Sequence, residues 1–195
     1  MRVAIVGAGF SGMAAASYLS SYSGVTVTLF DEKGVGGGAS GIAAGLMHPY
    51  PGRGMKRSQE ADQALVEVQH LLDLATKMGK GPIYQEGIER ECMNEESKAA
   101  LEEQMGYRDI EHIGLSRFLL HSGKTVYAKA YLESLFLYVT SKGVKLETMR
   151  VTHLEELADF DRVVIAAGPG IFSLLKGESF PLKQVKGQTV TFSHS

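Results

Sequence analysis

A glycine-rich turn between two apolar segments constrains the fold of this chain more than any other feature of its sequence. Residues 2–6 read Arg-Val-Ala-Ile-Val, a composition typical of a parallel strand that is buried on both faces. The turn follows at once and has a Gly-x-Gly-x-x-Gly pattern, made by Gly7, Ala8, Gly9, Phe10, Ser11 and Gly12. We expect Gly7 to permit a tight turn, Gly9 to let the backbone approach a pyrophosphate, and Gly12 to let the next helix pack closely.

An acidic residue stands at the distance from this turn that adenosine binding requires. A helix expected at residues 10–22 would direct its unpaired N–H groups and positive dipole end toward phosphates. A second strand is expected at residues 25–30, and Asp31 follows it, 19 residues after Gly12. A carboxylate there accepts hydrogen bonds from ribose hydroxyls and repels a 2′-phosphate. These features predict a site for an adenine dinucleotide, either FAD or NAD; the alternative is a glycine turn without a ligand.

A second stretch rich in small residues distinguishes these two cofactors. Residues 34–50 contain six glycines and three alanines, which suit a backbone that lies against a flat ligand. Ser40 is expected to cap a short helix through Gly45 and to offer its hydroxyl to a phosphate. The alternative is a flexible linker, but residues 42–47 turn apolar where a linker would turn polar. Because an NAD site needs no second segment of this kind, the stretch favours FAD.

Composition and charge exclude several other functions. The formal net charge is −2, so no overall field attracts nucleic acid or an anionic membrane. Nine acidic residues lie between residues 86 and 111, and we interpret them as a solvated face that repels nucleic acid. Cys92 is the only cysteine, which fits a buried apolar role in a reducing compartment and excludes a multi-cysteine metal site. No apolar run is long enough to cross a membrane, and no metal site is expected. The sequence predicts a cytoplasmic protein.

The rest of the chain alternates between helical and strand patterns. Apolar periodicity predicts helices at residues 58–78 and 130–141, and a polar helix is expected at residues 95–105. Strands are expected at residues 83–84, 88–92, 144–147, 150–154 and 162–167. Residues 118–120 and 125–127 are expected to form a hairpin across Ser122, Gly123 and Lys124, because this tripeptide is typical of a turn.

The glycine turn, followed by Ala-Ser-Gly-Ile-Ala-Ala-Gly-Leu-Met at residues 39–47, resembles the D-amino-acid oxidase superfamily of FAD-dependent enzymes. The glycine oxidase and sarcosine oxidase branches are the most similar. The resemblance implies an α/β fold, with a Rossmann-like FAD-binding domain of the glutathione-reductase type and part of an antiparallel substrate domain. It also implies that residues 39–47 run beneath the flavin and that Val151 presents its backbone to the adenine. Ile42 stands where relatives of the dimethylglycine dehydrogenase type carry a flavin-linked histidine, so FAD is expected to be bound non-covalently.

The motifs and the resemblance together give a set of expected cofactor-binding residues. They are Gly7, Ala8, Gly9, Phe10, Ser11, Gly12, Asp31, Glu32, Lys33, Ser40, Ala44, Gly45, Met47, Val151, Ala167 and Gly168. His48 and Tyr50 could line the flavin cavity, although a histidine in such a position is more often structural. No residue has the signature of a general base, so we name no catalytic residue.

The resemblance divides the chain into alternating parts. Residues 1–80 and 128–180 correspond to the FAD-binding domain, residues 81–127 to the first part of the substrate domain, and residues 181–195 to a truncated re-entry into it. The implied function is oxidation of the C–N bond of a small-molecule amine or amino acid. A non-catalytic dinucleotide-binding module and the flavin domain of an enzyme that modifies the tRNA wobble uridine are the alternatives. Residues 188–192 read as a strand without a partner, so we expect the chain either to dimerise or to need a segment that completes the sheet. The resemblance implies that the residues that hold the substrate come after residue 195, so the 195-residue chain alone is expected to be inactive.

Overall fold

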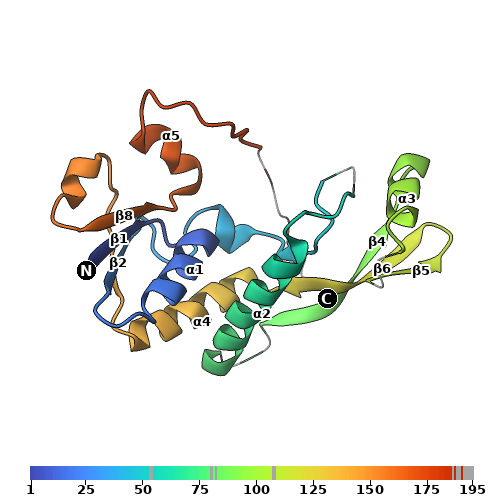
Figure 1. Ribbon diagram of the computed structural model, residues 1–195, viewed down its shortest axis with the longest axis horizontal. Helices are drawn as coiled ribbons and strands as arrows, with labels where there is room; N and C mark the ends of the chain where they lie inside the picture. The colour runs from blue at the N-terminus through green and yellow to red at the C-terminus, as the bar shows by residue number, and fades with distance from the viewer. Residues whose placement is uncertain are drawn as a thin grey trace.

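The computed structural model contains two sheets of different kinds. It describes residues 1–52, 55–79, 81, 83–106, 109–185, 187 and 190. One sheet is parallel and lies with helices α1 and α4, whereas the other is antiparallel and extends away from it beside helix α3 (Figure 1). Helix α2 lies between these two parts. This arrangement fits the α/β fold class that the sequence predicts.

The parallel sheet has the strand order β7-β2-β1-β8. Its strands are β1 (Arg2–Val6), β2 (Thr26–Phe30), β7 (Lys145–Glu147) and β8 (Arg162–Ile165). Both faces of β1 are covered, since the fully buried Ile5 belongs to one apolar cluster and the fully buried Ala4 to another. The apolar composition of residues 2–6 therefore has the structural cause that the sequence indicates.

Three helices share one apolar cluster with the parallel sheet, and within it α2 packs against α4. They are α1 (Phe10–Leu19), α2 (Ala61–Met78) and α4 (Ala128–Ser141). Met13, Leu72 and Leu135 are almost fully buried in the cluster that these helices form with the sheet. Gly79 follows the last residue of α2, as the sequence predicts, but α1 ends three residues earlier than residue 22. Helix α1, which directly follows the glycine turn, is thereby held against the sheet.

The antiparallel sheet is built around one long strand, β6 (Arg117–Val126). Strand β4 (Tyr84–Glu91) pairs along one side of it, while β3 (Leu46–Met47) and β5 (Ile110–Gly114) pair with different parts of the other side. Helix α3 (Glu95–Glu102) is near this sheet, and its Leu101 is buried with Phe118 and Leu120 in a second core. Cys92 is buried in the same core, in line with its expected apolar role.

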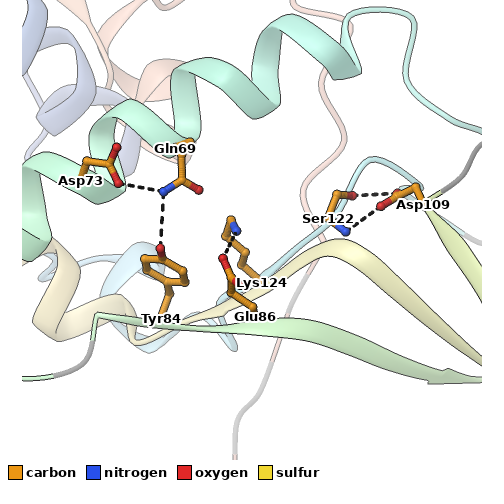
Figure 2. Close-up of polar contacts among 7 residues, drawn as sticks. All are labelled: Gln69, Asp73, Tyr84, Glu86, Asp109, Ser122 and Lys124. Carbon is orange, nitrogen blue, oxygen red and sulfur yellow. Dashed lines mark hydrogen bonds and ion pairs between the residues drawn. The ribbon is translucent and has the colours of Figure 1, made fainter.

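Polar contacts connect α2 with the antiparallel sheet (Figure 2). Gln69 of α2 donates to the hydroxyl oxygen of Tyr84 on β4 at 3.4 Å. The ammonium of Lys124 lies 5.0 Å from the centre of the Tyr84 ring and 3.1 Å from a carboxylate oxygen of Glu86. Since the side chain of Lys124 is only 11% exposed, these two contacts replace much of the hydration of its charge.

The predicted hairpin at residues 118–127 is wrong, because these residues form the single strand β6. Ser122 and Gly123 lie inside that strand at a shift in its register with β4, between the pairs Glu86–Lys124 and Ile88–Leu120. A Cβ atom on Gly123 would lie 3.0 Å from two carbon atoms of Ile88. The residues that resemble a turn are therefore required by a bulge and by close strand packing.

One other predicted strand differs from the structure, and another lies almost wholly outside the described residues. The strand expected at residues 150–154 is wrong, because residues 150–153 have no regular structure and Leu154–Leu157 is a 3-10 helix. Residues 181–185, the described beginning of the predicted re-entry segment, form no strand. Of the strand expected at residues 188–192, all but residue 190 lies outside the described residues, and residue 190 has no regular structure.

Replacement of Gly123 by alanine tests the packing of the bulge. The new methyl group would press on Ile88, so we expect the free energy of unfolding to fall by about 1–3 kcal/mol. The matched control is Gly81→Ala, because nothing lies within 4 Å of a Cβ built on Gly81. Urea denaturation measures both effects. Equal stabilities for the two variants would contradict a close contact between Gly123 and β4.

Candidate cofactor site

The glycine turn joins β1 to α1 at the carboxyl end of the parallel sheet. The N–H group of Gly7 donates to the carbonyl of Phe30 at 2.7 Å, and Gly7 has a φ of +109°, which disfavours every residue with a side chain. A Cβ on Gly12 would lie 1.8 Å from the carbonyl oxygen of Gly7. The two glycines therefore permit the tight turn and the close packing of α1 on it, as the motif predicts.

Asp31 holds the glycine turn through the backbone. One oxygen of its carboxylate accepts from the N–H of Ala8 at 2.9 Å, and the other accepts from the N–H of Lys33 at 2.9 Å. Each carboxylate oxygen can accept a further hydrogen bond, so these contacts leave acceptor capacity for ligand hydroxyls. Asp31 thus both shapes the turn and offers acceptors in the cleft beside it.

Ser40 approaches the glycine turn from the second small-residue segment. Its hydroxyl oxygen accepts from the N–H of Phe10, the first residue of α1, at 3.1 Å. A Cβ on Gly9 would lie 2.7 Å from that oxygen, so only glycine leaves room for the contact. The expectation that Ser40 caps a helix through Gly45 is wrong: the 3-10 helix is Ala39–Ile42, and Gly38 is at its cap. The hydroxyl instead satisfies an N–H group of a different helix.

Gly45 connects the second segment to the antiparallel sheet. Its carbonyl accepts from the N–H of Val126 at 2.8 Å, and its φ is +71°. A Cβ there would lie 1.9 Å from the carbonyl oxygen of Val126. Residues 43–47 are consequently fixed between the glycine turn on one side and β6 on the other.

Two adjoining clefts open along this arrangement. The first has a volume of about 390 Å³ and the second about 250 Å³, and Ala167 lines both. The first cleft lies at the carboxyl ends of β1 and β2, where nucleotides bind in sheets of this type. The second lies at the amino end of α1, where unpaired N–H groups and the helix dipole favour an anion.

Most of the expected cofactor-binding residues line one of these clefts. Those in the first cleft are Gly7, Asp31, Glu32, Lys33, Val151 and Ala167. Those in the second are Gly9, Phe10, Ser11, Ser40, Ala167 and Gly168. The remaining five residues line neither cleft: Ala8, Gly12, Ala44, Gly45 and Met47. Of these five, Ala8 and Gly12 are buried behind the turn, Ala44 is exposed, and Met47 packs partly against the main core.

Several lining residues were not anticipated from the sequence. They include Arg150, His153 and Lys176 in the first cleft and Leu182 in the second. Arg150 and His153 flank Val151, so their proximity in the sequence was a usable signal. Lys176 and Leu182 follow the short elements Gly168–Gly170 and α5 (Ile171–Leu174), and no local pattern marks their return toward the clefts.

Comparison with known proteins gives the family. Residues 2–195 match the model of the DAO family, described as FAD dependent oxidoreductase. The chain belongs to this family. The assignment confirms the resemblance noted in the sequence, and with the two sheets it confirms the predicted fold class. No curated protein matches the chain.

Several solved structures share the fold of this family member. Glycine oxidase from Geobacillus kaustophilus is 20% identical, with a TM-score of 0.71, over 89% of this chain and 57% of that one. Iminodiacetate oxidase from Chelativorans sp. BNC1 is 17% identical, with a TM-score of 0.61, over 76% of this chain and 47% of that one. L-amino acid deaminase from Proteus myxofaciens is 17% identical, with a TM-score of 0.61, over 74% of this chain and 37% of that one. The chain thus spans between 37% and 57% of the length of these proteins.

His48 and Tyr50 line neither cleft of this DAO-family chain. One ring nitrogen of His48 accepts from the N–H of Tyr50 at 3.2 Å, and the other lies 3.3 Å from the guanidinium of Arg90. Burial and the nearby Arg90 charge lower the pKa of His48, which favours its neutral form. Tyr50 is fully buried in the second core, and burial, followed by the Asp109 charge, raises its pKa to about 12.

Two further kinds of site are absent from the described residues. Within that part of the chain, no helix is long and apolar enough to cross a membrane. The same residues contain no group of three or more side chains that could hold a metal ion.

Glu156 fixes the outer wall of the first cleft. One of its carboxylate oxygens accepts from the N–H of Thr152 at 2.9 Å, the hydroxyl of Thr152 at 2.7 Å and the N–H of His153 at 2.8 Å. These hydrogen bonds from Thr152 and His153 lower the pKa of Glu156 below its ordinary value. The ionised carboxylate therefore orders the backbone next to Val151.

Replacement of Glu156 by glutamine tests this role. We expect the affinity for FAD to fall by less than about fivefold at pH 7, because solvent screens an exposed carboxylate. Because folding lowers the pKa, the stabilisation by Glu156 is present above the ordinary value of 4.5 and is lost as the pH falls through the lowered one. The stability difference between the parent and Glu156→Gln should therefore vanish in acid. Glu155→Gln is the control, and a difference independent of pH would contradict the assignment.

Proposed function

We propose that this chain is the FAD-binding part of a flavoprotein that oxidises the C–N bond of an amine or amino acid. The observation that carries the proposal is the contact between the two small-residue segments at the amino end of α1. There the hydroxyl of Ser40 meets the N–H of Phe10, in the room that Gly9 leaves by having no side chain. An NAD site requires only the first of these segments, whereas a flavin requires a second one to lie against.

The proposed orientation of FAD follows from the polarity of the two clefts. The adenosine occupies the first cleft, where Asp31 offers acceptors to the ribose hydroxyls and its charge disfavours a 2′-phosphate. The pyrophosphate lies against Gly9, Ser11 and Gly168 at the amino end of α1. The flavin ring lies along residues 43–47, which Gly45 fixes to β6. The sixteen expected cofactor-binding residues remain our proposal for this site.

Non-covalent attachment is the form of binding that the side chains support. Ile42 cannot form a flavin bond, although it occupies the position that carries a linked histidine in one branch of relatives. Among the described residues that line the two clefts, His153 is the only histidine. It lies in the cleft that we assign to adenosine, away from the proposed flavin segment.

The chemistry itself belongs to the cofactor. A bound flavin would supply a hydride acceptor for the carbon next to the substrate nitrogen, and the imine product would then hydrolyse. The residues of this chain bind and orient the cofactor. The names glycine oxidase, iminodiacetate oxidase and L-amino acid deaminase all denote enzymes that act on amino compounds, which supports this substrate class. We further propose a cytoplasmic location, because the only cysteine is a buried free thiol.

Two alternatives receive less support. A tRNA-modifying role would require a surface that attracts polyanions, yet eight of the nine acidic residues between residues 86 and 111 are exposed. A non-catalytic dinucleotide-binding module would have no use for the separate antiparallel sheet that meets the second small-residue segment through β3. Both observations favour an oxidoreductase that acts on a small molecule.

Binding of FAD by the purified chain tests the proposed function. We expect a yellow protein that binds FAD and does not bind NADP. Asp31→Ala should lower the affinity for FAD roughly tenfold to a hundredfold, since hydrogen bonds to a charged group contribute about 1.5–3 kcal/mol. Isothermal titration calorimetry measures both affinities. A colourless preparation that binds NAD but not FAD would overturn the proposal.

A matched control separates loss of the ligand contact from loss of stability. Asp161 accepts from the N–H of Arg2 at 2.6 Å, at the opposite end of β1 from Asp31. Asp161→Ala therefore also removes a carboxylate that holds the backbone of this strand. It should leave the affinity for FAD unchanged, and an equal loss in both variants would mean that Asp31 acts only through the fold.

A further inference from the structure

We propose that Arg150 and Glu32 form a clamp across the mouth of the first cleft, in which the guanidinium of Arg150 stacks on the adenine of the cofactor. The inference rests on the proposed function. It assigns the recognition of the base to a residue that neither the glycine motif nor the second small-residue segment contains.

The order of the parallel sheet brings the two residues together. Glu32 follows β2 and Arg150 follows β7, and these strands are neighbours with Phe30 opposite Glu147. The Nε atom of Arg150 lies 3.9 Å from a carboxylate oxygen of Glu32. Both residues line the first cleft with Asp31, so the ion pair links the ends of two neighbouring strands close to the proposed ribose site.

The position of this ion pair matters more than its contribution to stability. The side chains of Arg150 and Glu32 are 66% and 47% exposed, and an exposed pair of this kind stabilises a fold very little. It does restrict a long side chain to the mouth of the cleft. A guanidinium is planar, keeps its charge at every pH of interest and stacks on aromatic faces, including those of nucleic-acid bases.

The other side chains of the cleft are less suited to this role. Phe30 is only 6% exposed and packs edge-on against Phe160, with the ring centres 5.6 Å apart. Val151 packs partly into the same apolar cluster beneath the cleft. The backbone N–H of His153 is held by Glu156 at the start of a 3-10 helix. Arg150, in contrast, forms an ion pair with Glu32 at 3.9 Å, a distance that a ligand ring could alter at little cost.

The test compares two ligands that carry the same diphosphate, one with the adenine base and one without it. ADP and ribose 5-diphosphate share the ribose and the diphosphate, so a general electrostatic effect of Arg150 would weaken both. Stacking on adenine affects ADP alone. For Arg150→Gln we expect the affinity for ADP and FAD to fall about tenfold, with that for ribose 5-diphosphate unchanged. Arg150→Lys, which keeps the charge but not the plane, should lose most of the same factor.

A second pair of variants tests the contribution of Glu32. Glu32→Gln should lower the affinity for ADP by a smaller factor than Arg150→Gln does, because Arg150 remains but is no longer restrained. The double variant should bind ADP no more weakly than Arg150→Gln, since both changes remove one interaction. Arg117→Gln is the matched control, because Arg117 forms a comparable exposed ion pair with Glu89 at 3.4 Å in the antiparallel sheet. It should bind both ligands as the parent does.

The outcomes distinguish this inference from the proposed function. If the parent chain binds neither FAD nor ADP, the proposed function fails. If the parent binds both but Arg150→Gln binds ADP equally well, the clamp is wrong while the proposed function stands. An equal loss for ADP and ribose 5-diphosphate would likewise overturn the stacking role, because it would make Arg150 a contact of the phosphates or the sugar.

Discussion

The hydrogen bonds of the Asp31 carboxylate are the interaction on which the rest of the cofactor site depends. They join the end of β2 to Ala8 in the turn after β1 and to Lys33 in the segment that follows. A carboxylate in that place fixes three pieces of backbone at the edge of the sheet where parallel strands present their carboxyl ends. The same atoms face the first cleft, so one side chain serves both the shape of the turn and its proposed ligand.

The second small-residue segment adds what a single Rossmann turn lacks. Ser40 reaches the first N–H of α1, while Gly45 accepts from Val126 in the other sheet. A segment that touches both parts can support a ligand long enough to extend from one to the other. FAD is such a ligand, with an adenosine at one end and a flat ring system at the other.

The parts of the site that could be predicted are those whose causes are local in the sequence. The strand, turn, helix and acid lie within the first 31 residues, and each has its own composition signal. The role of Ser40 was misjudged because its partner, Phe10, lies thirty residues earlier. Ser122, Gly123 and Lys124 look like a turn locally, but Ile88 and Glu86 on the neighbouring strand keep them extended. Arg150 could be placed beside Val151, whereas its pairing with Glu32 depends on β7 lying next to β2.

The attachment of Gly45 to Val126 has a mechanical consequence. Val126 ends β6, and two residues later α4 begins, which packs against α1 and the 3-10 helix Ala39–Ile42. A closed series of contacts therefore connects the glycine turn, α1, α4, β6 and Gly45. Because each element is held by the next, a displacement of one is passed to the others. The antiparallel strands extend far from these contacts (Figure 1), so a movement of the outer ends of the strands would act on the contacts at their inner ends. A small tilt of their outer ends would reach residues 43–47 directly.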